Sequence, residues 1–273
     1  MSWSWKIGRL AGIDVRVHVT FLLLVAWMSI TPLVLGKGLA AVAAALGLNL
    51  AVFSFVLLHE LGHALAARRY GIKTRDITLW PLGGIASLER MPVNPRQELV
   101  VALAGPAVNV GLALVFAALT LLGGSFVPAA SGLPGTSLMA QLLLINVTMA
   151  AFNLIPAFPL DGGRVLRAVM AMRFDRVRAT WIAARVGQGF AVLFGIAGLF
   201  LNPMLTLIAV FVWVAAQQEA TATEAMGRAP RFPMGQDVGL YVIAVDTTEA
   251  RWLIVRSNTG AVAQKLGMVG WSP

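Results

Sequence analysis

Residues 51–69 read AVFSFVLLHELGHALAARR, an apolar run that ends at two arginines. With the apolar residues before it, from about residue 40, the run exceeds the roughly 20 residues that a helix needs to cross a bilayer. Three ionisable side chains lie inside it, those of His59, Glu60 and His63. An ionised group inside a membrane costs roughly 3 kcal/mol unless it is paired or bound. The run therefore predicts a membrane-spanning helix that carries a functional site.

His59 and His63 are spaced to hold a metal ion. Residues four apart on a helix face the same side, so both imidazoles can bind one zinc ion. Glu60 directly follows the first histidine and is placed to act as the general base that takes a proton from water. The alternative interpretation is two packing histidines and a stray glutamate. It is disfavoured because an unpaired glutamate in hydrocarbon has no compensation.

Composition extends the membrane interpretation to the whole chain. Of the 273 residues, 58% are apolar and 12% are charged, against roughly 45–50% and 25% in soluble domains. There is no cysteine, which excludes a disulfide framework and a cysteine-ligated metal site. The net charge of +9 suggests nucleic-acid binding as one possibility, so the placement of the basic residues has to decide.

Six apolar blocks predict the fold class, an α-helical polytopic membrane protein. The expected spans are about 17–36, 40–68, 98–124, 138–155, 181–201 and 204–218. Asn202-Pro203 separates the last two because proline disfavours helix in the residue before it, although a single span over 181–218 stays open.

The basic residues orient these spans. With six spans, every lysine and arginine except Lys37 falls on one side of the membrane. The positive-inside rule makes that side cytoplasmic. We therefore expect an integral protein of the lipid bilayer with both termini in the cytoplasm, and the composition favours a bacterial inner membrane. No nucleic acid is expected as a partner.

Three segments outside the spans have strand character. Residues 3–18 alternate around Ala11-Gly12 and predict an N-terminal β-hairpin. Residues 72–88 read as strand, break and strand, and they are too apolar for a cytosolic connector, so we expect a membrane-associated β-hairpin after the second helix. The tail, residues 228–273, contains a possible hairpin and is too short for an independent domain. The expected organisation is an intramembrane core over 1–227 and a short cytosolic tail.

A third zinc ligand is needed, because zinc in a hydrolase takes three protein ligands and an open fourth position. His18 is the remaining histidine, but Asp161 is the better candidate. Pro156 and Pro159 must end the fourth helix, which brings Asp161 to the cytoplasmic end of that span, on the side of the two histidines. The alternative is that Asp161 only caps the helix that follows.

The motifs His59-Glu60-Leu61-Gly62-His63 and Asn153…Pro159-Leu160-Asp161-Gly162-Gly163 resemble those of the site-2 protease family of intramembrane zinc metalloproteases. The segments 77–84 and 104–109 also resemble that pattern, and the resemblance covers about residues 5–220. It indicates the branch without an inserted PDZ domain. It implies one zinc ion held by His59, His63 and Asp161, with Glu60 as catalytic base. Relatives with this layout often carry a pair of CBS modules, for which the tail is too short.

The resemblance also implies the reaction, a regulated intramembrane proteolysis. The substrate would be a single-span, membrane-anchored regulatory protein, cut near the cytosolic end of its transmembrane helix. Two rival functions are a non-enzymatic zinc carrier or sensor, and an inactive homologue that acts as a scaffold. One ionisable cluster near one face argues against a carrier, and the intact Glu60 argues against the scaffold.

Several further residues have expected roles. Asn153 is expected to hydrogen-bond the developing oxyanion or orient the substrate, and its alternative is a helix cap. Asn109 is expected to bond between helices, and Arg164 and Arg167 to face lipid headgroups. The hairpin residues are expected either to hold an unwound substrate by strand addition or to plug the helix bundle. These residues are Ile77, Thr78, Leu79, Gly83 and Gly84.

Overall fold

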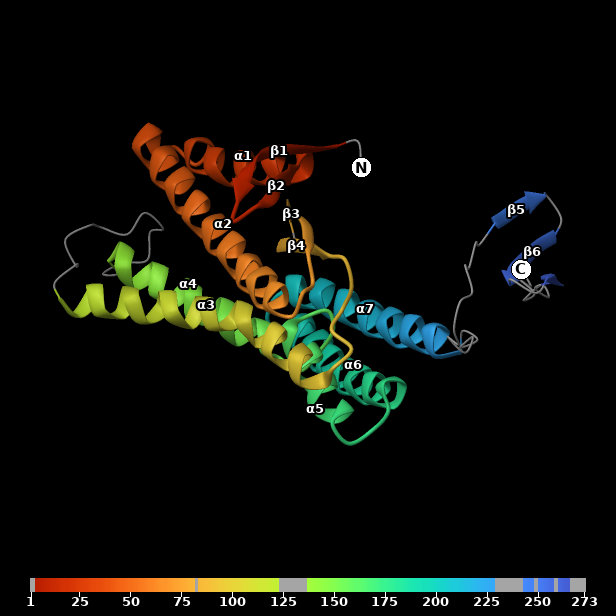
Figure 1. Ribbon diagram of the computed structural model, residues 1–273. Helices are drawn as coiled ribbons and strands as arrows, with labels where there is room; N and C mark the ends of the chain where they lie inside the picture. The colour runs from red at the N-terminus through yellow and green to blue at the C-terminus, as the bar shows by residue number, and fades with distance from the viewer. Residues whose placement is uncertain are drawn as a thin grey trace. The chain divides into compact units, whose positions relative to one another are not determined.

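The computed structural model describes residues 3–81, 83–122, 137–228, 243–247, 250–257 and 260–265. The chain forms two compact units, Met1–Gly227 and Arg228–Pro273. Each unit has its own secondary structure, and the first contains the helices (Figure 1). The residues of the expected site also belong to the first unit.

Helices make up most of the first unit. Its described helices are α1 (Val19–Val34), α2 (Gly38–Arg69), α3 (Pro95–Leu121), α4 (Leu138–Asn153), α5 (Asp161–Ala171), α6 (Arg176–Phe200) and α7 (Pro203–Arg228). Four of them, namely α2, α3, α6 and α7 as far as Ala225, are long and apolar enough to cross a membrane. Helices α1 and α4 are also apolar but have 16 residues each, fewer than the roughly 20 of a typical span.

The segment 181–218 forms two helices rather than one. Helix α6 ends at Phe200 and α7 begins at Pro203. Between them Asn202 accepts a hydrogen bond on its side-chain oxygen from the backbone N–H of Met204, at 2.9 Å. This is the cap that a helix beginning with proline at its first position commonly has. The turn predicted at Asn202-Pro203 is therefore present.

Four strands of the first unit form one sheet instead of two separate hairpins. Strands β1 (Ser4–Leu10) and β2 (Ile13–His18) are antiparallel, as are β3 (Thr74–Trp80) and β4 (Gly83–Leu88). Strands β2 and β3 pair in parallel, with Val15 opposite Ile77. The sheet order is thus β1-β2-β3-β4, with β4 at one edge. The pairing of β2 with β3 spans two helices along the chain, so local sequence patterns do not reveal it.

One face of the sheet packs on α1 and α2. Val17 and Leu79 form a buried cluster with Phe21 of α1. Ile13 and Ile77 form another with Ala64 of α2. Because alternate side chains of a strand point to opposite faces, this apolar face fixes the sheet against the half of α2 that contains the two histidines.

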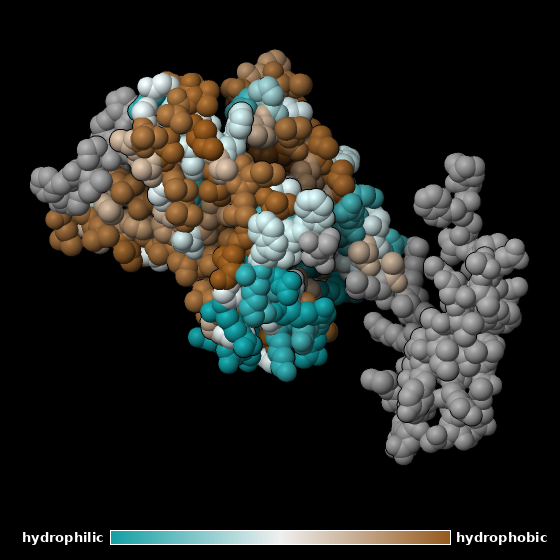
Figure 2. Space-filling model, turned by 90° about the horizontal axis from the view of Figure 1, so that it is seen from above, coloured by the Kyte–Doolittle hydropathy of each residue, from teal (hydrophilic) through white to brown (hydrophobic). Residues whose placement is uncertain are grey.

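The surface of the first unit is strongly apolar. Figure 2 shows hydrophobic residues over most of its visible surface, with hydrophilic residues gathered in a more restricted area. Large apolar side chains are exposed along several helices, among them Leu23, Trp27, Leu114, Leu199, Phe200 and Leu207. Exposed apolar area on this scale is typical of a surface that contacts lipid.

The second unit contains a small antiparallel sheet. Its strands are β5 (Ile243–Thr247), β6 (Ala250–Ser257) and β7 (Gly260–Lys265), in the order β5-β6-β7. A hairpin was expected from residues 237–245 and 251–255, and residues 237–242 lie outside the described part of the chain. The strand β7 follows as a third member that the sequence did not predict.

Candidate metal centre

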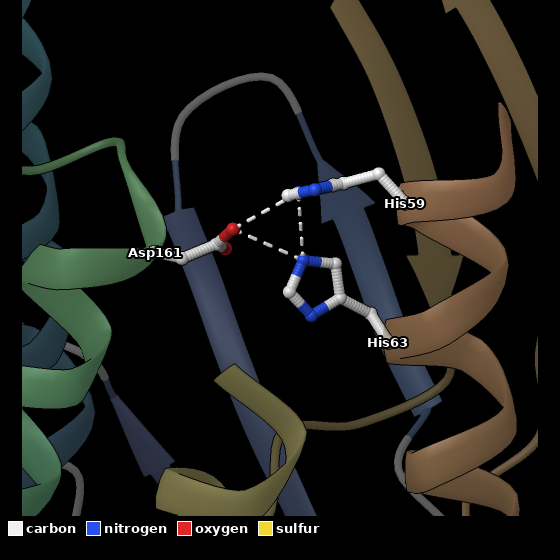
Figure 3. A group of neighbouring side chains, drawn as sticks. All are labelled: His59, His63 and Asp161. Carbon is white, nitrogen blue, oxygen red and sulfur yellow. Dashed lines mark hydrogen bonds and ion pairs between the residues drawn. The ribbon is translucent and has the colours of Figure 1, made fainter. Parts of the chain in front are cut away.

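Three buried side chains from two distant segments converge on one point. His59 and His63 project from α2, and Asp161 is the first residue of α5 (Figure 3). The Nε2 atoms of the two histidines lie 3.1 Å apart, and each lies 3.1 Å from Oδ2 of Asp161. All three residues are buried. The spacing of four residues on one helix face thus places both imidazoles side by side, as expected.

The donor set and its spacing fit zinc. Zinc binds imidazole nitrogen and carboxylate oxygen at about 2.0–2.2 Å, usually as a tetrahedron, whose edges are then about 3.3–3.6 Å long. The three donor atoms define a triangle with edges of 3.1 Å, close to one face of that tetrahedron. Three protein ligands leave the fourth position open, which is the arrangement of catalytic rather than structural zinc sites.

Both histidines are oriented by a hydrogen bond at the ring nitrogen that faces away from Asp161. His63 Nδ1 lies 2.7 Å from the backbone carbonyl of Val101, and His59 Nδ1 lies 2.6 Å from Oδ1 of Asn109. Both acceptors are on α3. Since each oxygen accepts, each Nδ1 donates its proton, and both Nε2 atoms keep a free lone pair for a metal.

Gly105 of α3 allows the two imidazoles to meet. A Cβ atom at position 105 would stand 2.7 Å from Nε2 of His59 and still closer to Nε2 of His63. Any larger side chain would therefore occupy the space where the two ligand atoms converge. The absence of a side chain at Gly105 lets α3 form a wall of the site.

Asp161 faces the histidines rather than capping its helix. The cap position of α5 is Leu160, whose side chain makes no capping hydrogen bond. Oδ2 of Asp161 instead lies 3.1 Å from Nε2 of each histidine. A carboxylate oxygen is a common zinc ligand beside imidazole nitrogen, so this placement suits Asp161 as the third donor.

Glu60 lies beside this group, under strand β4. A Cβ atom at Gly84 would stand 2.5 Å from Cγ of Glu60 and 3.3 Å from a methyl group of Val56. Strand β4 thus passes directly over the carboxylate side chain, and glycine is what allows the close approach. Glu60 is half-buried.

The remaining predicted residues lie around the site in different ways. The side chain of Asn153, the last residue of α4, donates a hydrogen bond to the carbonyl of Met149 at 3.0 Å. Ile77, Thr78 and Leu79 belong to β3, whose backbone pairs with β2 on one side and with β4 on the other. Both edges of β3 are therefore paired within the sheet. Its two edge strands are β1 and β4, and β4 contains Gly83 and Gly84.

Arg167 does not face lipid headgroups, which corrects the expectation for this residue. Its side chain is 1% exposed, and its Nε donates to Oε1 of Glu98 at 2.7 Å. It also pairs with Glu219 and lies over the ring of Phe158, 5.1 Å from its centroid. Arg176 approaches the other oxygen of Glu98 at 3.5 Å. This charged cluster joins α3, α5, α6 and α7, and it anchors the helix that begins with Asp161.

The hydrogen bonding between helices expected of Asn109 is confirmed by its contacts with His59 on α2 and Asn146 on α4. The sequence interpretation missed two contributors on α3, the carbonyl of Val101 and the close approach at Gly105. It also did not predict that the partner of Asn109 is one of the two histidines.

Comparison with known proteins adds an independent line of evidence. The model of the family described as peptidase family M50 matches residues 47–133 and 129–194. A zinc metalloprotease of Methanocaldococcus jannaschii is 34% identical over 225 residues, which are 82% of this chain and 62% of that protein. Stage IV sporulation protein FB of Bacillus subtilis is 28% identical over 168 residues, 61% of this chain and 55% of that protein. The chain therefore spans about 60% of the length of these curated relatives.

The fold also matches a solved structure. The site-2 protease from Methanocaldococcus jannaschii superposes with a TM-score of 0.59 at 31% sequence identity, covering 86% of this chain and 100% of that one. The first relative named above is described as a zinc metalloprotease. The donor set at His59, His63 and Asp161 fits the same metal.

Proposed function

Because the chain belongs to peptidase family M50, the site-2 protease family, we propose that it is a zinc-dependent intramembrane endopeptidase. It cuts a transmembrane helix of a membrane-anchored regulatory protein near the cytosolic side. The observation that supports this most directly is the convergence of three buried zinc donors beside a glutamate on an apolar helix. A purely structural zinc site has no need for that glutamate or for an open fourth position.

In this proposal His59, His63 and Asp161 hold the zinc ion, and Glu60 is the catalytic base. A zinc ion held there would supply Lewis acidity, which makes water easier to deprotonate and polarises a carbonyl oxygen. Glu60 takes the proton of the attacking water and later delivers it to the leaving amine. Its position under β4 shields this proton transfer from lipid on one side.

Strand β4 is the proposed substrate-binding edge. A helix hides its scissile carbonyls in backbone hydrogen bonds, so the substrate has to unwind before it can be cut. An unwound segment can pair with an exposed strand edge, and the edge strand that passes over Glu60 is β4, beginning with Gly83 and Gly84. The neighbouring strand β3 holds β4 in register through the backbone pairing of Ile77, Thr78 and Leu79. Asn153 is proposed to turn its amide to the substrate carbonyl once a substrate is bound.

The proposed topology has six crossings with both termini in the cytoplasm. The four candidate spans and the two shorter apolar helices α1 and α4 provide the six apolar segments. A short span can cross where neighbouring helices thin the bilayer. The basic residues then lie on the side of the metal centre, in the inner membrane of a bacterium.

The experiment that tests this function is a Glu60→Gln substitution. Tagged single-span membrane proteins are co-expressed with the wild-type protein. A tagged protein counts as a substrate if a shortened fragment of it appears only when the wild-type protein is present. We expect Glu60→Gln to retain one zinc ion per chain and to lose the fragment. The matched control is Glu89→Gln, which changes an exposed glutamate just beyond β4. This variant should cleave normally. Undiminished cleavage by Glu60→Gln would contradict the proposal. If the protein were only a zinc carrier, this substitution would leave its zinc transport unchanged.

A further inference from the structure

A row of hydrogen bonds leads from the metal centre to a helix that contributes no ligand to it. His59 Nδ1 lies 2.6 Å from Oδ1 of Asn109 on α3. Asn109 Nδ2 donates to Oδ1 of Asn146 on α4 at 3.0 Å. Asn146 Nδ2 in turn donates to the backbone carbonyl of Leu142 at 2.9 Å. Both asparagines are fully buried, so water does not compete for these groups.

The last member of the row determines the direction of all the others. A backbone carbonyl can only accept, so Asn146 must present its NH₂ group to Leu142 and its oxygen to Asn109. Asn109 must then present its own NH₂ group to Asn146, which leaves its oxygen for His59. The ring of His59 therefore donates at Nδ1. Its Nε2, the atom that faces Asp161, is left without a proton.

The opposite direction would be incompatible with metal binding. If the amide of Asn109 were reversed, its NH₂ group would face Nδ1 of His59, and the neutral ring would have to carry its proton on Nε2. That proton would stand where the metal has to bind. Such a reversal would also place two NH₂ groups, those of Asn109 and Asn146, against each other in a buried site, at a cost for each unsatisfied donor.

We infer that Asn146 is a positioning residue for the zinc ligand His59, acting through Asn109. It fixes which nitrogen of His59 carries the proton. The two histidines thus differ in how they are held. His63 is held directly by the carbonyl of Val101, whereas His59 depends on a relay that ends at a carbonyl of α4. The inference rests on the proposed zinc site but not on proteolysis, because it concerns the affinity for the metal.

Helix α4 offers a matched control for this role. Gln141 lies on the same helix, is 5% exposed, and its amide atoms have no hydrogen-bond partner among the described residues. Replacing Gln141 or Asn146 by leucine removes a buried amide from α4 in both cases. Only the change at Asn146 breaks the relay to His59.

The experiment measures zinc affinity of the purified full chain by competition with a chelator, without any substrate. Loss of a partner that orients a metal ligand typically costs about 10- to 100-fold in metal affinity. We expect Asn146→Leu to weaken zinc binding by this factor and Gln141→Leu to leave it within about threefold of the wild type. Should Asn146→Leu fail to fold, Asn146→Ala removes the amide without adding bulk and carries the same expectation.

A rescue separates the relay from simple packing. Aspartate at position 109 has two accepting oxygens and no NH₂ group, so it needs no neighbour to orient it. We therefore expect Asn109→Asp to restore most of the zinc affinity lost in Asn146→Leu. Unchanged affinity in Asn146→Leu, or a loss that Asn109→Asp does not restore, would overturn the inference. If Glu60→Gln kept its proteolysis, the proposed function would fail while the affinity measurement would still decide this inference.

Discussion

Gly84 of β4 lies directly against the side chain of Glu60 on α2. A Cβ atom at position 84 would stand 2.5 Å from Cγ of Glu60 and 3.2 Å from its Cδ. Real Cβ atoms do not approach this closely, so either the strand or the carboxylate would have to move. The backbone of β4 therefore packs directly on the side chain of the proposed base, Glu60, with no side chain between them. A shift of the strand would move the carboxylate as well.

Gly84→Ala is expected to lower proteolysis by about 100-fold, because a displacement of about 1 Å at a reacting group can cost that much. Zinc content should stay at the wild-type level, since the nearest neighbours of a Cβ atom at position 84 belong to Glu60 and Val56 and not to a ligand. Gly8→Ala in β1 of the same sheet is the control, because a Cβ atom there meets nothing within 4 Å. Equal cleavage by both variants would show that β4 does not control Glu60.

Gly105→Ala is expected to abolish zinc binding. The added methyl group would lie between the two imidazoles, 2.7 Å from Nε2 of His59, so the ligand atoms could no longer converge. Zinc content of the purified protein, measured by atomic absorption, checks this expectation. Gly111→Ala on the same helix, where a Cβ atom meets nothing within 4 Å, should keep its zinc. Stoichiometric zinc in Gly105→Ala would exclude the metal position proposed above.

Removal of the metal is expected to lower the thermal stability of the wild type. A ligand that binds only the folded state stabilises it by about 2.7 kcal/mol at a concentration of 100 times its dissociation constant. Chelation should therefore lower the unfolding temperature of the wild type and leave that of Asp161→Ala unchanged. His18→Ala serves as control, since His18 stacks on Trp80 with ring centroids 3.9 Å apart and is not part of the site. It should respond to chelation like the wild type.

Arg167→Leu is expected to destabilise the fold by up to about 3–5 kcal/mol, the cost of breaking a buried ion pair by removing one partner. The carboxylate left behind is that of Glu98, whose side chain is 2% exposed and which keeps only the longer contact with Arg176 at 3.5 Å. Thermal unfolding measures the effect. Lys6→Leu removes a pair with Asp14 of which the lysine is 49% exposed, and it should leave the unfolding temperature unchanged. A small effect of Arg167→Leu would mean that the cluster does not anchor α5.

The parts of the site that follow from local geometry could be predicted from the sequence. His59 and His63 share a helix face because of the periodicity of the helix, and two prolines before Asp161 ended the preceding helix as expected. These features depend on residues close together along the chain.

Features that depend on distant contacts could not be predicted in this way. The partner of His59, Asn109, lies 50 positions away, and the choice among polar residues depends on how two helices pack. Likewise, Arg167 was expected at the headgroups because an isolated arginine prefers water. Its burial becomes favourable only through Glu98 and Glu219, which come from two other helices.

The parallel pairing of β2 with β3 also sets the order in which the protein can mature during translation. The ribosome releases β2 before α1 and α2, and β3 only after both. The hairpin of β1 and β2 can therefore pair with β3 only after α1 and α2 have been made, and β4 reaches Glu60 later still. Asp161 emerges after two further helices, α3 and α4. A nascent chain consequently cannot assemble its three metal ligands until the helices α1 to α4 have all been made.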